Sequence, residues 1–192
     1  MFILKSGTSG YTAEVDSNNR VQAFSTSQTH STSAALMSDY YNINSGVINL
    51  TSASASALLY VKNTDTVTWS IGRVFYNFGS STGGTGDALA EIISIPTAGT
   101  LVSAGSTITP HNFNFASPKL LLGTVKAGVE GSTVTDGAVA ISSIMPIVAT
   151  RVLINFDSIV LTPGASLAIR ITPQTGNTSM NVQVGLNLHR EV

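Results

Sequence analysis

Alternating apolar and polar positions are the main structural signal in this chain. The run "MNVQVGLNLHREV" (180–192) shows it most clearly, because aliphatic residues occupy every second position: Val182, Val184, Leu186 and Leu188. A period of two places these side chains on one face of a β-strand and the intervening polar residues on the other face. The run therefore predicts a strand with one buried face and one face toward solvent.

Other segments rich in β-branched and aromatic residues are also predicted as strands: 57–63, 67–78, 86–96, 119–128, 137–145, 151–164 and 165–176. The segment 86–96 could instead form a single helical turn, but its apolar run favours a strand. The sequence "TPG" (162–164) predicts a β-turn, because proline followed by glycine fits the central turn positions. In 165–176, Leu167, Ile169 and Ile171 share one face.

The segment "VTWSIGRVFYNF" (67–78) carries bulky apolar residues on both predicted faces. Strict alternation puts one set on the first face: Trp69, Ile71, Arg73, Phe75 and Asn77. It puts the other set on the second face: Ser70, Gly72, Val74, Tyr76 and Phe78. Such a strand is covered on both sides, either within the domain or by a neighbouring subunit.

Closely spaced strands with Gly, Pro and Asn turns predict an all-β sandwich or barrel for residues 34–192. No heptads and no longer repeat period are visible in the sequence. The long interval between 67–78 and the later strands favours Greek-key connections over a simple meander.

Residues 1–33 form a separate N-terminal region that is predicted to be a docking arm. "YTAEV" (11–15) and "RVQAF" (20–24) flank the turn-forming "DSNN", which predicts a β-hairpin followed by an extended Ser/Thr tether over 25–33. Two strands with so few apolar anchors are marginal in water, so the hairpin needs a partner surface. The predicted partner-binding residues are Tyr11, Glu14, Val15, Asp16, Arg20, Val21 and Phe24.

The charge of the chain argues against several classes of partner. Charged residues make up only 10% of the sequence, and nine basic residues meet ten acidic ones, for a net charge of −1. This balance lacks the basic footprint of a nucleic-acid binder and the polybasic patch of a membrane-surface protein. No apolar run is long enough to span a membrane, and we expect no secretory signal because a polar run follows directly at Lys5. The Ser, Thr and Asn residues suit a surface packed against neighbours, although they also fit an ordinary hydroxyl-rich β protein.

Candidate catalytic and metal-binding residues do not form a recognisable motif. The sequence has no Cys, which excludes disulfides and thiolate sites. His30, His111 and His189 are far apart in sequence and are interpreted as surface polar residues. The Gly-rich loop 79–87 lacks the Lys-Ser/Thr of a phosphate-binding loop and is predicted to be a hairpin tip or a partner contact. We expect no enzymatic activity, cofactor, metal or small-molecule substrate.

Aromatic residues are the other candidates for ligand binding. Trp69 lies in an apolar strand, so we expect it in the core and not on a sugar-binding surface. The segment "DYYNIN" (39–44) offers Tyr40 and Tyr41 as exposed aromatics, unless it is an edge strand that contributes to the core.

Three segments carry a resemblance to a known family. "GYTAEVDSNNRVQAF" (10–24) resembles the opening of virion-associated proteins of tailed bacteriophages, and "ALLYVKNTDTVTW" (57–69) and "LTPGASLAIRI" (161–171) resemble parts of jelly-roll capsid decoration, or cement, proteins. The resemblance implies a jelly-roll-like antiparallel β-sandwich with an N-terminal β-hairpin arm. It also implies a homotrimer on the outer capsid surface that bridges major capsid proteins, with no catalytic residues.

Two functions follow as expectations. The first is a structural virion protein that binds the outer capsid surface and stabilises the shell. The alternative is the receptor- or glycan-binding head of a tail fibre or adhesin, with a site near Tyr40 and Tyr41 or in the loop 79–87.

Overall fold

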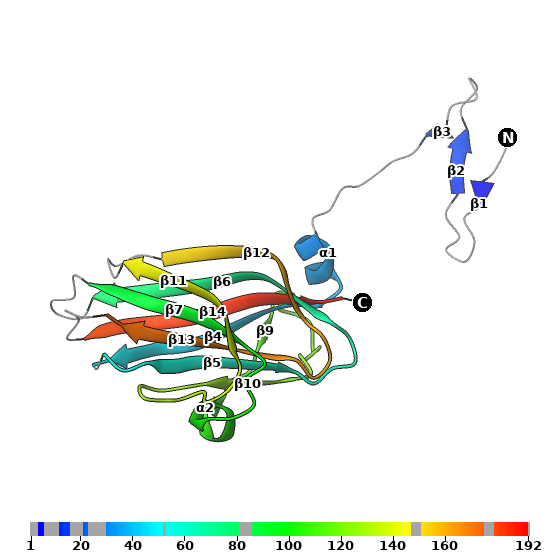
Figure 1. Ribbon diagram of the computed structural model, residues 1–192. Helices are drawn as coiled ribbons and strands as arrows, with labels where there is room; N and C mark the ends of the chain where they lie inside the picture. The colour runs from blue at the N-terminus through cyan, green and yellow to red at the C-terminus, as the bar shows by residue number, and fades with distance from the viewer. Residues whose placement is uncertain are drawn as a thin grey trace. The chain divides into compact units, whose positions relative to one another are not determined.

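The computed structural model describes residues 4–5, 12–15, 21–22, 30–51, 53–80, 86–146, 151–174 and 179–191. The chain divides into two compact units, Met1–His30 and Ser31–Val192. Figure 1 labels most elements of both units, which are numbered in chain order.

The first unit contains short antiparallel strands in the order β1-β2-β3, which are β1 (Leu4–Lys5), β2 (Thr12–Val15) and β3 (Val21–Gln22). The pairing of β2 with β3 confirms the predicted hairpin. Strand β1 pairs along the other side of β2 and was not predicted, because two residues are too few to show an alternating pattern.

The rest of the described chain is almost entirely β-structure. Its elements are α1 (His30–Leu36), β4 (Tyr40–Leu50), β5 (Ser56–Asn63), β6 (Trp69–Ser80), β7 (Asp87–Ser94), α2 (Thr100–Ala104), β8 (Ser106–Thr107), β9 (His111–Asn112), β10 (Gly123–Ala127), β11 (Ala138–Pro146), β12 (Arg151–Leu161), β13 (Ser166–Pro173) and β14 (Met180–Arg190). The strands predicted at 57–63, 67–78, 86–96 and 137–145 are therefore confirmed, with shifts of a few residues at their ends.

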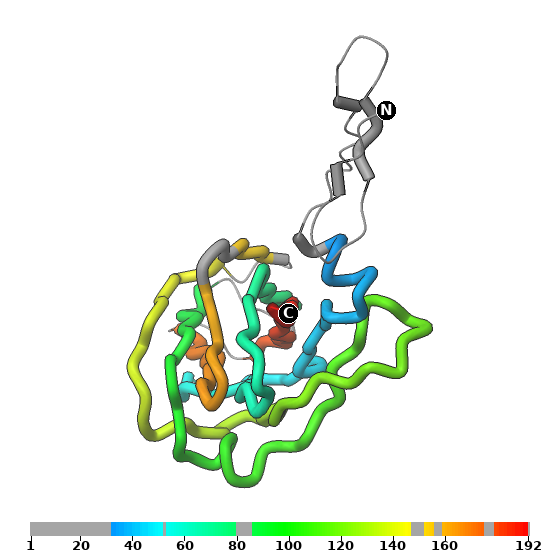
Figure 2. The backbone as a smooth tube through the Cα atoms, turned by 90° about the vertical axis from the view of Figure 1, so that its right-hand side faces the viewer, coloured from blue at the N-terminus to red at the C-terminus, as the bar shows by residue number. Residues whose placement is uncertain are grey.

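These strands form two antiparallel sheets that pack face to face. One sheet has the order β11-β7-β13-β5-β10-β8, and the other has the order β12-β6-β14-β4-β9. Strands β4 to β7 alternate between the sheets, and so do β11 to β14. This alternation of two four-strand sets is a jelly roll, which confirms the predicted all-β sandwich. The two layers can be followed from the side in Figure 1 and nearly along the strands in Figure 2.

The core lies between the sheets and follows the predicted alternation in the last two strands. Leu167, Ile169 and Ile171 of β13 are buried in it, together with the aliphatic residues of β14. Ala168 belongs to a second buried cluster on the outer face of the six-stranded sheet, where Leu101 of α2 covers it. The outer face of that sheet is thus partly closed by α2.

The alternation predicted for β6 is wrong at one point. Trp69 and Ile71 are buried in the core, but Arg73 is exposed and Val74 is fully buried. The register against β14 shifts here, because β6 has one extra residue at Gly72. Such a bulge moves every later side chain to the opposite face. Val74 and the alternating residues after it therefore join Trp69 in the core.

Three connections differ from the predictions. The segment 79–87 joins β6 to β7, which belong to different sheets, so it is not a hairpin tip. The strand predicted at 119–128 begins only at Gly123. The end of the predicted extended tether is helical, because α1 begins at His30 and continues through residues of high helix propensity, Ala34 and Ala35.

The "TPG" turn is confirmed. The Ala165 N–H donates to the Thr162 carbonyl oxygen at 2.9 Å, and Gly164 has a φ of 85°. That positive φ suits glycine at the third position of a type II turn. The turn carries the chain from β12 in one sheet to β13 in the other.

Candidate functional site

The residues predicted to dock on a partner fall in the first unit. Glu14 and Val15 lie in β2 and Val21 lies in β3, and the register places Val15 opposite Val21. Tyr11, Asp16, Arg20 and Phe24 lie outside the described residues, and so does the turn between the strands. The structure thus supports the hairpin pairing and does not test the predicted contacts.

The strands of this unit are unusually short. They contain two, four and two residues. Strands of this length form few cross-strand pairs, and small isolated sheets are marginal in water without a further hydrophobic surface. The outer strands β1 and β3 each pair on one side only within the described residues. Each therefore presents an edge that another strand could extend.

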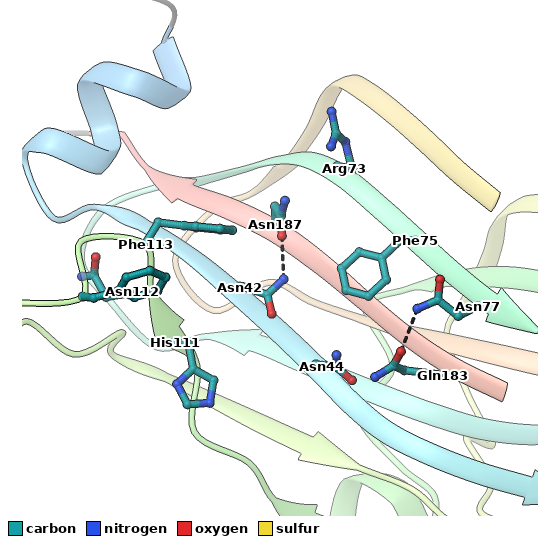
Figure 3. A pocket seen from close by; sticks show the side chains of 11 residues that line it. Asn42, Asn44, Arg73, Phe75, Asn77, His111, Asn112, Phe113, Gln183 and Asn187 are labelled. Atoms are coloured by element: carbon teal, nitrogen blue, oxygen red, sulfur yellow. Dashed lines mark hydrogen bonds between the residues drawn. The ribbon is translucent and has the colours of Figure 1, made fainter. Parts of the chain in front are cut away.

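A second candidate site is a polar groove on the outer face of the five-stranded sheet (Figure 3). It is an open pocket of about 590 Å³. Its floor carries amide side chains from three neighbouring strands, namely Asn42, Asn44, Asn77, Gln183 and Asn187. The groove could bind a polar ligand that matches the donors and acceptors of these amides.

Four of the five amides of the groove form two pairs across the strands, and Asn44 Oδ1 instead accepts from the Gly46 backbone N–H. Asn42 Nδ2 donates to Asn187 Oδ1 at 2.8 Å, and Asn77 Nδ2 donates to Gln183 Oε1 at 2.7 Å. Both pairs join residues that are directly opposite each other in the antiparallel register. The backbone pairing of β14 with its two neighbours therefore aligns the amides and fixes their orientation.

The floor of the groove also contains one large apolar side chain, Phe75. Its ring lies over Gly185 of β14, where a Cβ atom would overlap the ring and the Ile43 carbonyl oxygen. Glycine is required there by close packing. Phe75 is only 5% exposed, so it supports the floor and offers little open ring surface.

One wall of the groove is formed by β9 and the residues after it. Asn112 Nδ2 donates to the Ser38 carbonyl oxygen at 2.8 Å, which holds this segment against the start of β4. The Phe113 ring stacks on Tyr40 with ring centroids 4.5 Å apart and an interplanar angle of 20°. Phe115 is 91% exposed at the rim. The exposed aromatics of this end therefore lie in the segment after β9.

The prediction that Tyr41 is an exposed aromatic is wrong. Its side chain is fully buried in the core, and its hydroxyl donates to the Ser38 carbonyl oxygen at 3.1 Å. Burial, and then the charge of Asp39, raise the pKa of Tyr41. The alternative interpretation, that this segment contributes to the core, holds for Tyr41. Trp69 is fully buried as predicted.

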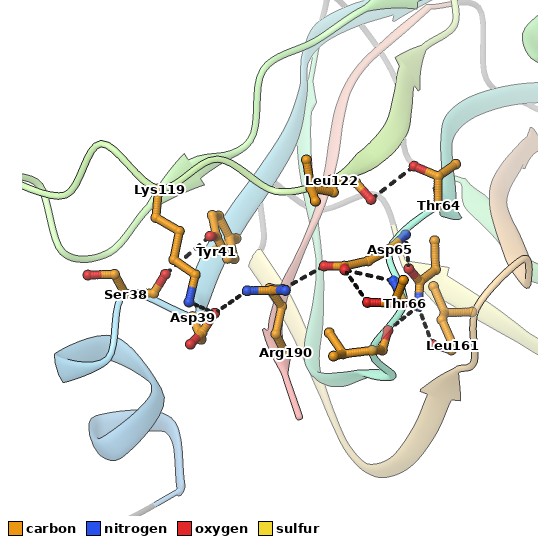
Figure 4. A network of polar contacts seen from close by, with 12 residues as sticks. Ser38, Asp39, Tyr41, Thr64, Asp65, Thr66, Lys119, Leu122, Leu161 and Arg190 are labelled. Carbon is orange, nitrogen blue, oxygen red and sulfur yellow. Dashed lines mark hydrogen bonds and ion pairs between the residues drawn. The ribbon is translucent and has the colours of Figure 1, made fainter. Parts of the chain in front are cut away.

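The most charged cluster in the described chain is buried beside the C-terminal end of β14 (Figure 4). Arg190 Nη1 donates to Asp39 Oδ1 at 2.8 Å, and Arg190 Nε donates to Asp65 Oδ2 at 2.7 Å. Lys119 Nζ lies 2.6 Å from the same Asp39 oxygen. The cluster joins the start of β4, the β5–β6 turn and the end of β14.

The protonation states of this cluster fit a structural role. Burial alone would raise the pKa of Asp65, but hydrogen bonds from Arg190 and from the Thr66 and Val67 backbone N–H groups hold that pKa below its ordinary value. Burial opposes the charge of Arg190, but its bonds to Asp65 and Asp39 raise its pKa. A carboxylate held ionised in this way has no proton to donate near neutral pH.

The histidines are in three different environments. His30 begins α1, and His111 is exposed on the wall of the groove. His189 is only 8% exposed, so its predicted surface position is wrong, and its Nε2 lies 3.1 Å from Glu191 Oε1. Alternation along β14 places His189 on the face opposite Leu188, and its ring is covered there by Tyr40 on the neighbouring strand, which packs edge-on against it.

Within the described residues, no three His, Asp or Glu side chains come together as a metal site. The same part of the chain contains no helix that is long and apolar enough to cross a membrane. Residues 81–85 of the Gly-rich loop lie outside the described residues.

Comparison with known proteins adds no assignment. No protein-family model matches this sequence, and no curated protein matches it.

Proposed function

We propose that this protein is a structural component of a tailed-bacteriophage virion that binds the outer capsid surface and stabilises the shell. In this proposal its partner is the major capsid protein, and it acts as a homotrimer without catalysis, cofactor or nucleic acid. The observation that carries the proposal is the N-terminal unit. Its strands of two to four residues form a sheet separate from a jelly roll that has its own complete core.

The proposed mechanism is strand addition. The edges of β1 and β3 can pair with a strand of a capsid subunit, and backbone hydrogen bonds then supply affinity with little demand on side-chain charge. This fits a chain with 10% charged residues and a net charge of −1. Three arms in one trimer would act at high effective concentration once the first is bound, so weak single contacts would give tight attachment. Bridging several capsid subunits would oppose their separation under internal pressure.

A truncated chain tests the proposal. A variant that begins at His30 keeps α1 and the whole jelly roll and removes the short strands. We expect the full chain to co-sediment with expanded capsids of the cognate phage, and the truncated chain to stay in the supernatant. Circular dichroism and a thermal melt serve as the folding control. Equal co-sedimentation of the two chains would refute the docking arm, and failure of the full chain to bind would refute the capsid partner.

A matched variant separates strand pairing from mere chain length. Val15 and Val21 occupy opposite positions in β2 and β3. Replacing both with Asp places like charges opposite each other, which destabilises the pairing of the strands. We expect this full-length variant to lose capsid binding as the truncated chain does, with an unchanged melt of the jelly roll.

A further inference from the structure

The groove on the outer face of the five-stranded sheet has no role in the proposed docking mechanism. It is built from residues of four strands, β4, β6, β9 and β14, and of the segment after β9, and its paired amides are aligned by the sheet register. We infer that this groove is an oligosaccharide-binding site, in which the paired amides bond sugar hydroxyls and the aromatic wall packs on the apolar face of a sugar ring.

The amide pairs have the chemistry that sugar hydroxyls need. A carboxamide offers two N–H donors and an oxygen with two lone pairs. The bond between Asn42 and Asn187 uses one donor of the first and one lone pair of the second. The Asn42 oxygen and the Asn187 amino group remain for a ligand, and the Asn77–Gln183 pair has the same arrangement. A hydroxyl both donates and accepts, so adjacent sugar hydroxyls can satisfy such a set.

The groove is also preorganised. Each of the four paired amides is held by its partner and by antiparallel backbone pairing on both sides of β14. A ligand therefore does not have to immobilise several free side chains, which reduces the entropic cost of binding. The Phe75 ring beneath the amides is fixed by its contact with Gly185.

The aromatic wall supplies the apolar part of the site. Phe113 is 38% exposed and Phe115 is 91% exposed, and both line the groove. Stacking on Tyr40 holds the Phe113 ring in place. The C–H face of a sugar ring can cover such rings while its hydroxyls reach the amides. A purely apolar partner would leave the amides without bonds, which costs free energy on burial.

The charge of the lining narrows the ligand class. The lining residues include Arg73 and His111 and no carboxylate. This favours neutral or carboxylated sugars over cationic ligands. The groove is open and has a volume of about 590 Å³, which is within the range of small-ligand sites, so it suits a short chain of sugar units lying along it.

The test is a glycan array that carries neutral and carboxylated oligosaccharides, probed with the full chain. The best glycan is then titrated by calorimetry against three variants. Phe115→Ala removes an exposed ring, and Asn42→Ala with Asn187→Ala removes one amide pair. Leu122→Ala is the matched control, because Leu122 is 59% exposed and does not line the groove.

We expect the two groove variants to weaken binding by about fivefold or more, as loss of one stacking or hydrogen-bond contact does, and the control to bind as the wild type does. A full chain that binds no glycan on the array would overturn the inference. So would a glycan that binds all variants equally. The chain that begins at His30 should bind the glycan normally, so failure of this site and failure of capsid docking give different results.

Discussion

Replacing Arg190 with Met should strongly destabilise the jelly roll. Arg190 is the direct partner of two buried carboxylates, Asp39 at 3% exposure and Asp65 at 6% exposure. Methionine keeps the apolar stem of the side chain and removes the charge. The variant therefore leaves Asp65 without its cation and Asp39 with Lys119 alone.

The magnitude follows from these contacts. Breaking a buried ion pair from one side costs about 3–5 kcal/mol of unfolding free energy. We expect the lower end, about 3 kcal/mol, because Asp39 keeps Lys119 and Asp65 keeps the Thr66 N–H bond at 2.7 Å. For a domain of this size such a loss lowers the melting temperature by roughly 6–12 °C. Urea unfolding at pH 7, followed by Trp69 fluorescence, measures it.

The pH dependence gives a sharper test. In the wild type the pKa of Asp65 is below its unfolded value, so its stabilisation is present above the unfolded pKa and lost as pH falls through the folded pKa. Without Arg190, burial should raise the pKa of Asp65 in the folded protein instead. Protonation at low pH then removes the free-energy cost of burying an ionised carboxylate that has lost its cation. The difference in unfolding free energy between the two proteins should therefore narrow from pH 7 to about pH 4.

A control variant and two possible results test whether Arg190 stabilises the fold through the buried carboxylates. Lys119→Met removes the cation that is 37% exposed from the same cluster, and we expect a loss of less than about 1 kcal/mol. If Arg190→Met costs no more unfolding free energy than Lys119→Met at pH 7, the ion pairs of Arg190 with Asp39 and Asp65 do not stabilise the fold as proposed. A difference that stays constant from pH 7 to pH 4 would show that Asp65 is not held ionised by Arg190.

Two further substitutions probe the packing of the jelly roll. Asn63 is fully buried and donates to two backbone carbonyls at 2.9 and 2.8 Å, so Asn63→Ala should cost about 2–4 kcal/mol in a thermal melt; a loss under about 1 kcal/mol would contradict the assigned bonds. Gly123→Ala places a Cβ atom into the Trp69 ring and should cost about 1–3 kcal/mol and shift Trp fluorescence. Gly72→Ala is its control, because a Cβ there meets nothing within 4 Å, and equal effects of the two would refute the packing argument.

The sequence was sufficient to predict the β-sandwich, because most strands show a period of two or a dense β-branched composition. It was not sufficient to predict which side chains of β6 face the core. A single extra residue at Gly72 reverses the alternation of faces, and the apolar pattern gives no sign of it. The sequence also could not show which turns cross between sheets. The residues of a crossing such as 162–165 are the same types that form a hairpin turn.

The groove was not predicted, although part of its signal is visible in the sequence. Asn and Gln residues occur at alternating positions of two strand segments, 42–44 and 181–187, and Asn77 lies in a third. Their meeting depends on the register of β14 between β4 and β6, which no local pattern fixes. Tyr41 was placed on the surface for the same reason. Its burial depends on how β4 packs in the sheet and not on its neighbours in sequence.

In the function proposed here, the N-terminal unit attaches this protein to a capsid. A cryo-EM reconstruction of expanded capsids with the full chain added tests it most directly. We predict trimeric density on the outer surface in which the strands of Met1–His30 pair with a strand of the major capsid protein. Density that contacts the capsid only through the jelly roll, or capsids that carry no added density, would contradict it.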